Sequence, residues 1–393
     1  MDPEIEKLDK AWEEFCDTLK AAGRHPRANE LGLSARDKAA GYLQLARNIS
    51  LGLQFKYDGD DRMFPELNRY FDPMRKQGGD NSDCVYIGAQ IDGRETYRIF
   101  GYRGTSKYFS VVAVEEGDPW GAGTIATLYG KDIETDADGN FELFISPHEH
   151  EGNWLKTTDK TFRVTFRQYF ADWEAEKPMR AQIERLSSPE ITHPEPLDPE
   201  ALGKGLVNAA RWVDQSIGYW PMMLNKWAPR KNEFRSYWQL EDTNIDATPG
   251  GDPIVCYWQL PKDECLIVRV HPVECTWWGV EFGNVWWETM DYRFRLSNTN
   301  EHYAQIEDDG ELIIVVAHED PGVPNWLDCS GFTAGYITFR WMLSEVHPIP
   351  KAEQVKFSER FAHMPDGVKR MGLEARKAQL ATRKRGVYAR FGY

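Results

Sequence analysis

The sequence contains no long apolar run: none of its hydrophobic stretches approaches the roughly 20 residues that a helix needs to cross a bilayer. Its first 15 residues, MDPEIEKLDKAWEEF, are acidic and amphipathic, unlike a secretory signal peptide. Basic residues are also few, since 47 Lys and Arg stand against 62 Asp and Glu and leave a formal net charge of −15. Phosphate binding needs a basic surface. We therefore expect neither a membrane nor a nucleic acid as the main partner.

Cysteine is scarce, and the short motifs of several enzyme classes are missing. The 6 cysteines form no CxxC pair and no zinc-like spacing, which is typical of reduced thiols in a cytoplasmic protein. A GxSxG sequence is absent, so a serine nucleophile of the hydrolase type is not expected. Neither GxGxxG after a strand nor GxxxxGK[ST] occurs, which argues against a nucleotide cofactor. We expect no cofactor.

Tryptophan, in contrast, is abundant, with 15 residues, and aromatic residues make up 13% of the chain. Large aromatic side chains fill protein cores, where the indole N–H needs a hydrogen-bond partner, and they also line ligand pockets. Both interpretations stay open from the composition alone.

Hydrophobic periodicity divides the chain into five segments. The first 55 residues repeat apolar side chains at three- and four-residue steps, as amphipathic helices do. From Cys84 the period changes to two, which predicts short strands, and the alternation of helical and strand patterns then recurs. Runs of short strands favour antiparallel sandwiches. The expected segments are an N-terminal helical segment (1–80), a first β unit (81–170), a helical insert (171–245), a second β unit (246–345) and a basic helical tail (346–393).

The ends of the two β segments repeat one pattern. The first reads DGNFELFISPHEHEGNWLKTTDKTFRVTFRQYF and the second DGELIIVVAHEDPGVPNWLDCSGFTAGYITFRWML. Asp-Gly, His-Glu, Asn-Trp-Leu and Phe-Arg follow in the same order in both, with gaps that differ by one or two residues. This order indicates an internal duplication. We therefore expect a mainly β protein with helical additions (α+β), built of two related antiparallel β-sandwich or jelly-roll-like units.

Residues shared by both copies are predicted to build the fold, because active sites are seldom duplicated within a chain. If one copy has chemistry, we expect it to be the second, which lies close to a Trp-Trp and Asp-Tyr-Arg cluster that the first copy lacks.

The second copy, preceded by WWETMDYRFRLSNTN, resembles the DUF1214 family, a family of unknown function. The most specific piece is DPGVPNWLD, followed about a dozen residues later by FRW. The first copy is similar to the corresponding earlier region of longer members, and the resemblance covers most of residues 80–345. It implies an antiparallel β-sandwich or jelly-roll core with helical additions. It implies no activity, so it assigns no catalytic residue.

A metal site is the first chemical candidate. His148 and His150 would project from the same side of a strand and could share an ion. However, Gly152 indicates that the strand has already ended, and the second copy has Asp320 in place of His150. These two histidines are therefore weak candidates, and a solvated polar loop is the preferred interpretation.

Acid–base chemistry is the second candidate, centred on the stretch WWETMDYRFRLSNTN. On a strand, Asp291 and Arg293 would project from one face, opposite Tyr292. An arginine beside a carboxylate or histidine can polarise a substrate oxygen while a proton moves. Asp291 or His318 would be the base, and Arg293 and Tyr292 would stabilise the oxygen or act as the acid, with Glu319 beside His318. An ion-paired outer face is the alternative.

Aromatic residues concentrate in YWPMMLNKW and SYWQL, at the end of the helical insert. Such an insert could seal the core, or it could wall a pocket for a bulky apolar ligand between the insert and the second β unit. The predicted binding residues are Trp220, Met223, Trp227, Trp238, Trp286, Trp287, Asn325 and Trp326.

These patterns predict a cytoplasmic protein that binds and transforms a bulky apolar or aromatic small molecule by cofactor-independent acid–base chemistry, in the lyase or hydrolase class. The alternatives are a non-catalytic ligand-binding or assembly protein, and a metal-dependent enzyme that uses His148 and His150. Residues 351–393 carry 11 Lys and Arg against 4 Asp and Glu. This basic tail is expected to lie across the acidic body or across a neighbouring subunit, which would make the protein a homo-oligomer.

Overall fold

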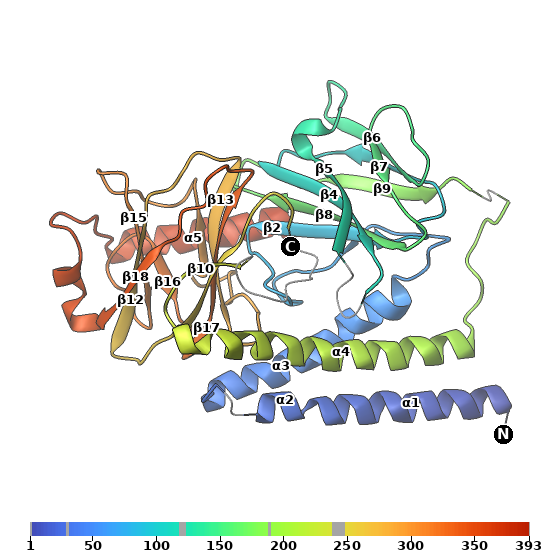
Figure 1. Ribbon diagram of the computed structural model, residues 1–393, viewed down its shortest axis with the longest axis horizontal. Coiled ribbons are helices and arrows are strands. Elements are labelled where there is room, and N and C mark those ends of the chain that lie inside the picture. The colour runs from blue at the N-terminus through green and yellow to red at the C-terminus, as the bar shows by residue number, and fades with distance from the viewer. Residues whose placement is uncertain (1, 29–30, 118–122, 188–189, 238–247, 393) are drawn as a thin grey trace.

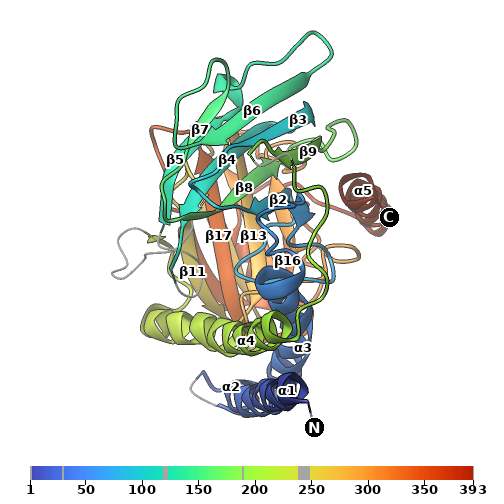
Figure 2. The ribbon, with the colours of Figure 1, turned by 90° about the vertical axis from the view of Figure 1, so that its right-hand side faces the viewer.

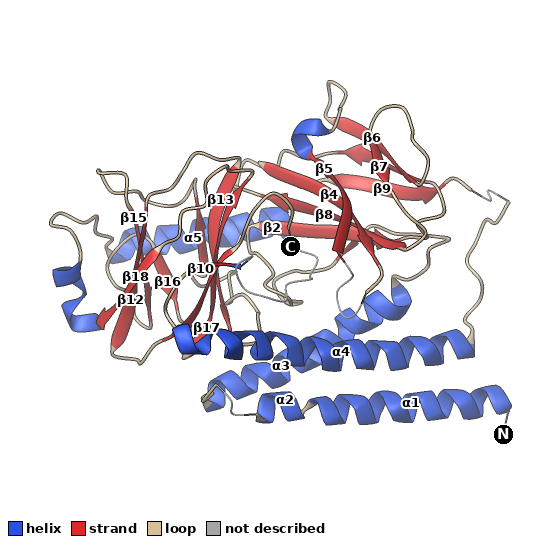
Figure 3. Cartoon of the chain, viewed as in Figure 1, coloured by secondary structure: helices blue, strands red, loops and turns tan. Residues whose placement is uncertain are grey.

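The computed structural model describes residues 2–28, 31–117, 123–187, 190–237 and 248–392 (Figure 1). It places two β units next to each other, a layer of helices along one side of both, and a C-terminal helix along another side. Figure 3 shows how the strands gather in the two units and how the long helices lie outside them.

The first β unit contains two sheets. A five-stranded sheet has the order β1-β2-β8-β4-β5, and a four-stranded sheet has the order β7-β6-β3-β9. The strands of the larger sheet are β1 (Asn68–Arg69), β2 (Cys84–Gln90), β8 (Thr161–Tyr169), β4 (Tyr108–Glu115) and β5 (Gly123–Tyr129). Those of the smaller sheet are β7 (Trp154–Lys156), β6 (Asn140–Ser146), β3 (Tyr97–Tyr102) and β9 (Arg180–Arg185).

The second β unit repeats this arrangement strand for strand. Its five-stranded sheet has the order β10-β11-β17-β13-β14 and its four-stranded sheet the order β16-β15-β12-β18. The larger sheet consists of β10 (Arg235–Ser236), β11 (Ile254–Gln259), β17 (Ala334–Met342), β13 (Trp277–Asn284) and β14 (Asn298–Asn300). The smaller sheet consists of β16 (Trp326–Asp328), β15 (Leu312–Ala317), β12 (Glu264–Val270) and β18 (Lys351–Lys356). This agreement confirms the two related β units that the sequence predicts.

The Asn-Trp element of the sequence repeat closes each unit in the same way. Asn153 Nδ2 donates to the carbonyl oxygens of residues 134 and 142, and Asn325 Nδ2 donates to those of residues 305 and 313. The indole N–H groups of Trp154 and Trp326 each donate to a carbonyl oxygen at 3.1 Å, at the end of β6 and β15 respectively. In both units this element forms the parallel strand pair, β6 with β7 and β15 with β16. It is therefore part of the scaffold.

Tryptophan fills the core between the two sheets of the second unit. Trp258 and Trp341 have no exposed surface, and Trp278 packs against the same cluster. Their buried indole N–H groups have partners: Trp258 Nε1 donates to Gly283 O and Trp341 Nε1 to Pro348 O, each at 3.1 Å. The core of the first unit uses phenylalanine, isoleucine and valine instead, with Phe166 at its centre. Three of the 15 tryptophans thus belong to the core of this unit.

The helical layer consists of α1 (Pro3–Ala22), α2 (Arg24–Arg27), α3 (Ala35–Leu53) and α4 (Pro199–Trp227). A π-helical segment, η1 (Gln54–Asp58), continues α3. Ser34 is the N-cap of α3, because its hydroxyl accepts from Asp37 N and the Asp37 carboxylate accepts from Ser34 N. Helices α1 and α3 pack against α4, and α4 contacts β11 of the second unit (Figure 1).

Two segments that the sequence predicts as helical contain strands. Residues 180–185 form β9 and residues 351–356 form β18, the edge strands of the two four-stranded sheets. Both are rich in Arg, Lys, Glu, Gln and Ala, which favour helices. Pairing with β3 and β12 outweighs this local preference, because each edge position supplies backbone hydrogen bonds to a sheet that is otherwise open. The remaining short helices are η2 (Gly130–Asp132), η3 (Ala228–Arg230) and η5 (Phe357–His363).

The C-terminal helix α5 (Leu373–Phe391) lies across the side of the β units, away from α1 and α4 (Figure 2). Three of its arginines are buried against the rest of the chain. Arg376 pairs with Asp320 at 2.9 Å, Arg383 Nη2 donates to Asn298 O, and Arg390 Nη2 donates to Ser82 O. The basic tail therefore lies across the chain's own body. Its predicted role in a homo-oligomer stays a prediction.

Two further findings concern the described residues as a whole. No helix among them is long and apolar enough to cross a membrane. All six cysteines are free thiols, of which Cys16 is exposed and Cys275 partly buried.

Candidate functional site

A cavity of about 140 Å³ lies between the two β units. The five-stranded sheets of both units form walls of this cavity, and α4 adds Trp220. Two loops complete it: residues 77–81, which precede β2, and the segment before β11, with Thr248 and Pro253. Because β1 and β10 are equivalent, the two loops occupy equivalent places in their units. The cavity is therefore built by corresponding parts of the duplicated chain.

Each five-stranded sheet contributes the same two polar side chains. Thr165 and Arg167 of β8 line the cavity, and so do their repeat equivalents Thr338 and Arg340 of β17. Arg163 also lines it, since alternate residues of a strand project from the same face. The Phe-Arg element of the sequence repeat thus directs two guanidinium groups into one cavity.

Three polar atoms of the cavity wall are buried without a hydrogen-bond partner in the described part of the chain. They are Arg340 Nη1, Thr165 Oγ1 and Gln77 Oε1. More than nine in ten buried polar groups in proteins have a partner, and leaving one unpaired costs about 1–3 kcal/mol. Unpaired polar atoms in the wall of one cavity are the pattern of a site that a bound molecule completes.

Asp80 reaches the cavity wall from a turn that requires glycine. Gly78 and Gly79 have φ values of +68° and +72°, which side-chain-bearing residues rarely adopt. A Cβ atom on Gly79 would lie 2.1 Å from Trp287 Nε1, and Gly79 N donates to Trp287 O at 2.8 Å. The turn is thus held against the second unit, which fixes the position of Asp80.

The Asp80 carboxyl is 2% exposed and accepts a hydrogen bond from Thr289 Oγ1 at 2.8 Å. Burial raises the pKa of Asp80 to about 7, because it disfavours the charged form more than Lys76 and Thr289 favour it. A carboxyl that titrates near neutral pH can both accept and release a proton.

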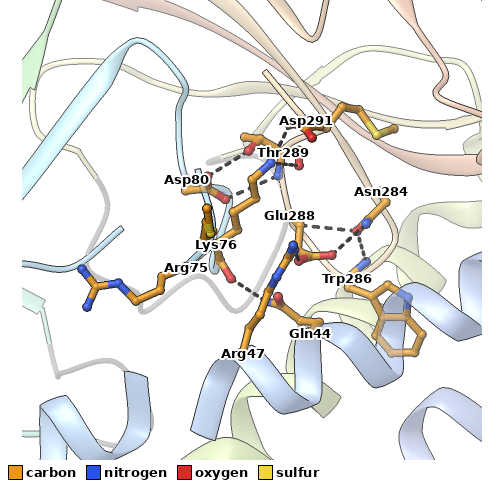
Figure 4. A network of polar contacts seen from close by, with 12 residues as sticks. Gln44, Arg47, Arg75, Lys76, Asp80, Asn284, Trp286, Glu288, Thr289 and Asp291 are labelled. Carbon is orange, nitrogen blue, oxygen red and sulfur yellow. Dashed lines mark hydrogen bonds and ion pairs between the residues drawn. The ribbon is translucent and has the colours of Figure 1, made fainter. Parts of the chain in front are cut away.

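A buried network supports Asp80 from behind (Figure 4). Lys76 Nζ donates to Thr289 O at 2.9 Å and to Met290 O at 2.6 Å, and lies 4.6 Å from the centre of the Tyr292 ring. Burial lowers the pKa of Lys76, although Asp80 opposes this shift. In the same network, Arg47 pairs with Glu288 at 2.9 Å. These contacts of Lys76 and Thr289 therefore hold the segment between β13 and β14 against the loop that contains Asp80.

Glu281 is the second carboxyl group in the cavity wall. It lies on β13 and is 2% exposed. Its Oε2 accepts from Ser82 N at 2.6 Å and from Ser82 Oγ at 2.8 Å. Burial raises the pKa of Glu281 well above its ordinary value, Asp83 and Asp80 add to the rise, and the Ser82 bonds only partly oppose it. The environment of Glu281 thus favours its protonated form.

The first unit has no equivalent of this acid. Glu281 pairs with Thr338 across β13 and β17, and the corresponding pair on β4 and β8 is Val112 with Thr165. Val112 is fully buried. The acid therefore occurs in only one of the two repeats.

Aromatic rings form the remaining wall. Trp220 of α4 stacks on Trp287, with ring centres 4.8 Å apart and planes 18° apart. Trp287 also stacks on Tyr336 at 4.4 Å. The other aromatic residues in the wall are Phe55, Tyr70, Phe71, Tyr86 and Tyr237. The cavity thus combines an apolar, aromatic side with arginines and buried acids.

A scan against protein-family models matches residues 86–172 to the family described as "Protein of unknown function (DUF1214)". Among solved structures, the chain is similar to an uncharacterized protein from Burkholderia cenocepacia, with 30% sequence identity and a TM-score of 0.86. This alignment covers 90% of the chain and 99% of that protein. The chain belongs to the DUF1214 family.

The VPA0106 protein from Vibrio parahaemolyticus is more distant, with 12% identity and a TM-score of 0.46 over 80% of the chain and 98% of that protein. No curated protein matches the chain. The family match lies in the first β unit, whereas the sequence analysis places the most specific resemblance in the second, where no match to the family model is found.

Two of the predicted binding residues of this DUF1214 protein, Trp220 and Trp287, line the cavity and stack on each other. Met223 and Trp227 are buried in the cluster behind them. Trp286 is buried in the same cluster, and its Nε1 donates to Asp37 O at 2.7 Å. Trp238 lies outside the described residues.

The predicted catalytic residues do not converge. The sequence predicts a strand around Asp291, but β14 begins only at Asn298, and Asp291 lies in the preceding turn. There Arg293 Nε pairs with Asp291 Oδ1 at 2.9 Å, and Tyr292 is buried under Lys76. Burial opposes ionisation of Asp291, but Arg293 and Lys76 outweigh it and lower the pKa of this carboxyl. Asp291 is therefore a poor base, and none of these three residues lines the cavity.

His318 and Glu319 follow the end of β15, in another part of the second unit. His318 Nε2 lies 3.2 Å from Leu260 O, and Glu319 is exposed. Asn325 and Trp326 belong to the closing element of that unit, and they lie outside the cavity.

The histidines of the first copy do not form a metal centre. The ring of His150 stacks on Phe144 at 4.6 Å, and His148 is exposed. In the described ranges there is no group of three or more His, Cys, Asp or Glu side chains that could hold a metal ion. The solvated loop is the interpretation that fits these positions.

Sequence reasoning missed the residues that do line the cavity. Arg167 and Arg340 form a repeated Phe-Arg pair in the sequence, but repetition alone predicts a role in the scaffold. Asp80 lies in the sequence QGGDNSD, where Gly-Gly before an acid indicates a tight, constrained turn. Glu281 stands in the run WWGVEFGN as an acid among strand residues, which is the sequence mark of a buried carboxyl.

Proposed function

We propose that the cavity between the β units binds a small, partly aromatic or apolar molecule and transforms it by acid–base chemistry without an organic cofactor. The observation that carries this proposal is the position of Asp80. This buried carboxyl, with a pKa of about 7, lies in the wall of a cavity that also presents the unpaired Arg340 Nη1.

The two carboxyl groups suit different roles. Asp80 loses its proton near neutral pH and can act as the base. Burial favours the protonated form of Glu281, which can act as the acid. Two carboxyl groups whose environments separate their protonation states are a recurrent basis for acid–base assignments.

In a lyase reaction of this kind, Asp80 takes a proton from a carbon of the substrate, a double bond forms, and the bond to the leaving group breaks. Glu281 supplies the proton that the leaving group needs. The step leaves Asp80 protonated and Glu281 ionised, and proton exchange with water restores both groups. An arginine near the substrate oxygen stabilises negative charge as it develops. The hydrolase class, in which the base would activate a water molecule, uses the same two groups.

A second candidate function is ligand binding without catalysis. It is favoured by the bonds that the acids already make. Glu281 accepts two hydrogen bonds from Ser82, and Asp80 accepts one from Thr289, and both links join one unit to the other. In that case the acids would hold the junction together and the cavity would only store or carry its ligand.

Exchange of substrate protons for deuterium separates the two functions. Native mass spectrometry of the purified protein identifies the bound small molecules, and NMR in D2O then follows deuterium incorporation at their carbon atoms. We expect the wild-type protein to catalyse exchange and Asp80→Asn to abolish it while the ligand still binds.

The matched control is Asp291→Asn, which removes the ion-paired acid outside the cavity and should leave exchange unchanged. Ligand binding without either exchange or hydrolysis of the ligand in the wild-type protein would favour the non-catalytic function. Exchange that depends on Asp291 and not on Asp80 would contradict the proposed site.

A further inference from the structure

We propose that the molecule bound in the cavity is an organic carboxylate with a body of about one ring, and that its carboxylate pairs with Arg340. This inference rests on the proposed function, because it takes the cavity as the ligand site. It adds the chemical class of the ligand and the residue that recognises it.

The first argument is the unpaired charge of Arg340. Its Nη1 is buried without a hydrogen-bond partner, and no carboxylate of the described chain pairs with it. Its cross-strand neighbour on β13 is Gly279, which has no side chain to offer. A guanidinium presents a planar fork of donors that matches a carboxylate. Burying this donor is unfavourable until an acceptor of the ligand meets it.

The second argument concerns the acids that face the same space. Asp80 is held by Thr289 and lies near the buried Lys76, whose charge opposes its own. Glu281 is held by Ser82. Neither acid pairs with Arg340. Among the described residues of the wall, no carboxylate therefore neutralises Arg340, which favours a ligand that brings one.

The third argument is the size and chemistry of the remaining wall. A cavity of about 140 Å³ is close to the roughly 150 Å³ of an apolar cavity that accepts benzene. Trp220, Trp287 and Val255 supply apolar surface. A ring or a short branched chain fits this space beside a carboxylate.

Matched acids and amides test the inference, since each pair differs in charge and hardly in shape. The probes are benzoate with benzamide and phenylacetate with phenylacetamide, measured by ligand-observed NMR and by thermal unfolding. We expect both acids to bind the wild-type protein and to raise its Tm by about 2 °C or more when they are in large excess over Kd. The amides should bind at least about tenfold more weakly.

Variants at Arg340 assign the effect to that residue. Arg340→Gln should weaken acid binding by about tenfold to a hundredfold, and Arg340→Lys, which keeps the charge without the fork, should weaken it less. The control is Arg98→Gln, on the four-stranded sheet of the first unit, where Arg98 pairs with Glu142 and Glu184. It should bind the acids as the wild type does.

Each other outcome contradicts the inference. If the amides bind as tightly as the acids, or if Arg340→Gln binds the acids normally, the ligand is not recognised through this carboxylate contact. Should Asp80-dependent exchange persist on neutral ligands, the proposed function stands and only the carboxylate class fails. If no acid or amide binds at millimolar concentration, both the ligand class and the cavity as ligand site are overturned.

Discussion

The two β units share one strand order, one closing Asn-Trp element and one Thr-x-Arg pair, yet they differ where the cavity has its chemistry. Val112 of the first unit corresponds to Glu281 of the second. By the same register, Arg163 corresponds to Tyr336, two residues before the paired threonines. The scaffold is what the repeats have in common. The candidate acid is among the residues by which they differ.

The comparison also shows how a duplicated residue can serve one site. Arg167 and Arg340 are copies of the same position, but the two units face each other and both arginines line the same cavity. A junction between repeats turns two equivalent surfaces into the two walls of one pocket. Repetition along the chain therefore does not exclude a role in binding.

Exchanging the residues that distinguish the units should have the largest effect. Val112→Glu introduces a carboxyl at a fully buried position with no Ser82 to bind it. We expect the free energy of unfolding to fall by about 3–5 kcal/mol, the usual result of an uncompensated buried charge. Urea denaturation measures it. The reverse change, Glu281→Val, removes a buried acid and should cost about 2 kcal/mol or less, through the Ser82 donors that it leaves unpaired. Equal losses of unfolding free energy in the two variants would contradict the predicted difference between the units.

The turn before Asp80 gives the next effect. Gly79→Ala forces a side chain onto a residue with φ of +72° and into Trp287. We expect a loss of about 2–4 kcal/mol, because strain adds to overpacking. Gly152→Ala is the control. Gly152 has a similar φ of +79° and no atom within 4 Å of the added Cβ, so it should lose only about 1 kcal/mol. Thermal unfolding of both variants tests this. A Gly79 variant as stable as the Gly152 variant would mean that the turn is not pressed against the second unit.

The closing elements of the two units provide a smaller contrast. Asn325 is 4% exposed and Asn153 is only partly buried, although both donate two hydrogen bonds and accept one. We expect Asn325→Ala to cost about 2–3 kcal/mol and Asn153→Ala about 1 kcal/mol, since water can replace lost bonds only at the more exposed site. Chemical denaturation gives both values. A larger loss at Asn153 would reverse the predicted order.

The pH dependence of stability gives the most specific effect. The pKa of Asp80 is raised to about 7 in the folded protein, while an exposed aspartate titrates near 3.9. The folded state therefore binds more protons than the unfolded state between these values, and Asp80 makes the protein less stable as pH rises from about 4 to 7. In Asp80→Asn this decrease should be smaller. Denaturation from pH 4.5 to 8 measures the free energy of unfolding of both proteins. If it changes with pH in parallel in the two proteins, the pKa of Asp80 is not raised in the folded state.

Much of the scaffold could be predicted from the sequence, because the sequence patterns that predict it are local and repeated. The strand period, the Asp-Gly turns and the Asn-Trp element predict two β units and indicate that these units are related. Strands β9 and β18 could not be predicted in this way, since their residues favour helices and only pairing with a distant strand holds them extended.

The site was harder to predict, because it lies between units that are far apart in the sequence. The partners of Asp80 and Glu281, Thr289 and Ser82, lie 209 and 199 residues away from them. No spacing rule links such pairs. The prediction of Asp291 as a base depends on a strand in this segment. The segment forms a turn instead, and the Asp291 carboxylate is paired with Arg293. Trp220 and Trp287 were found because aromatic density is visible without knowledge of the fold.

A crystal structure of the protein with benzoate or a co-purified ligand tests the central claim most directly. The account predicts density for one ring-sized molecule between the β units, next to Trp220 and Trp287, with its acidic group within hydrogen-bond distance of Arg340 Nη1 and its body near Asp80. Ligand density beside Asp291 or His318, with only water in the cavity between the units, would contradict it.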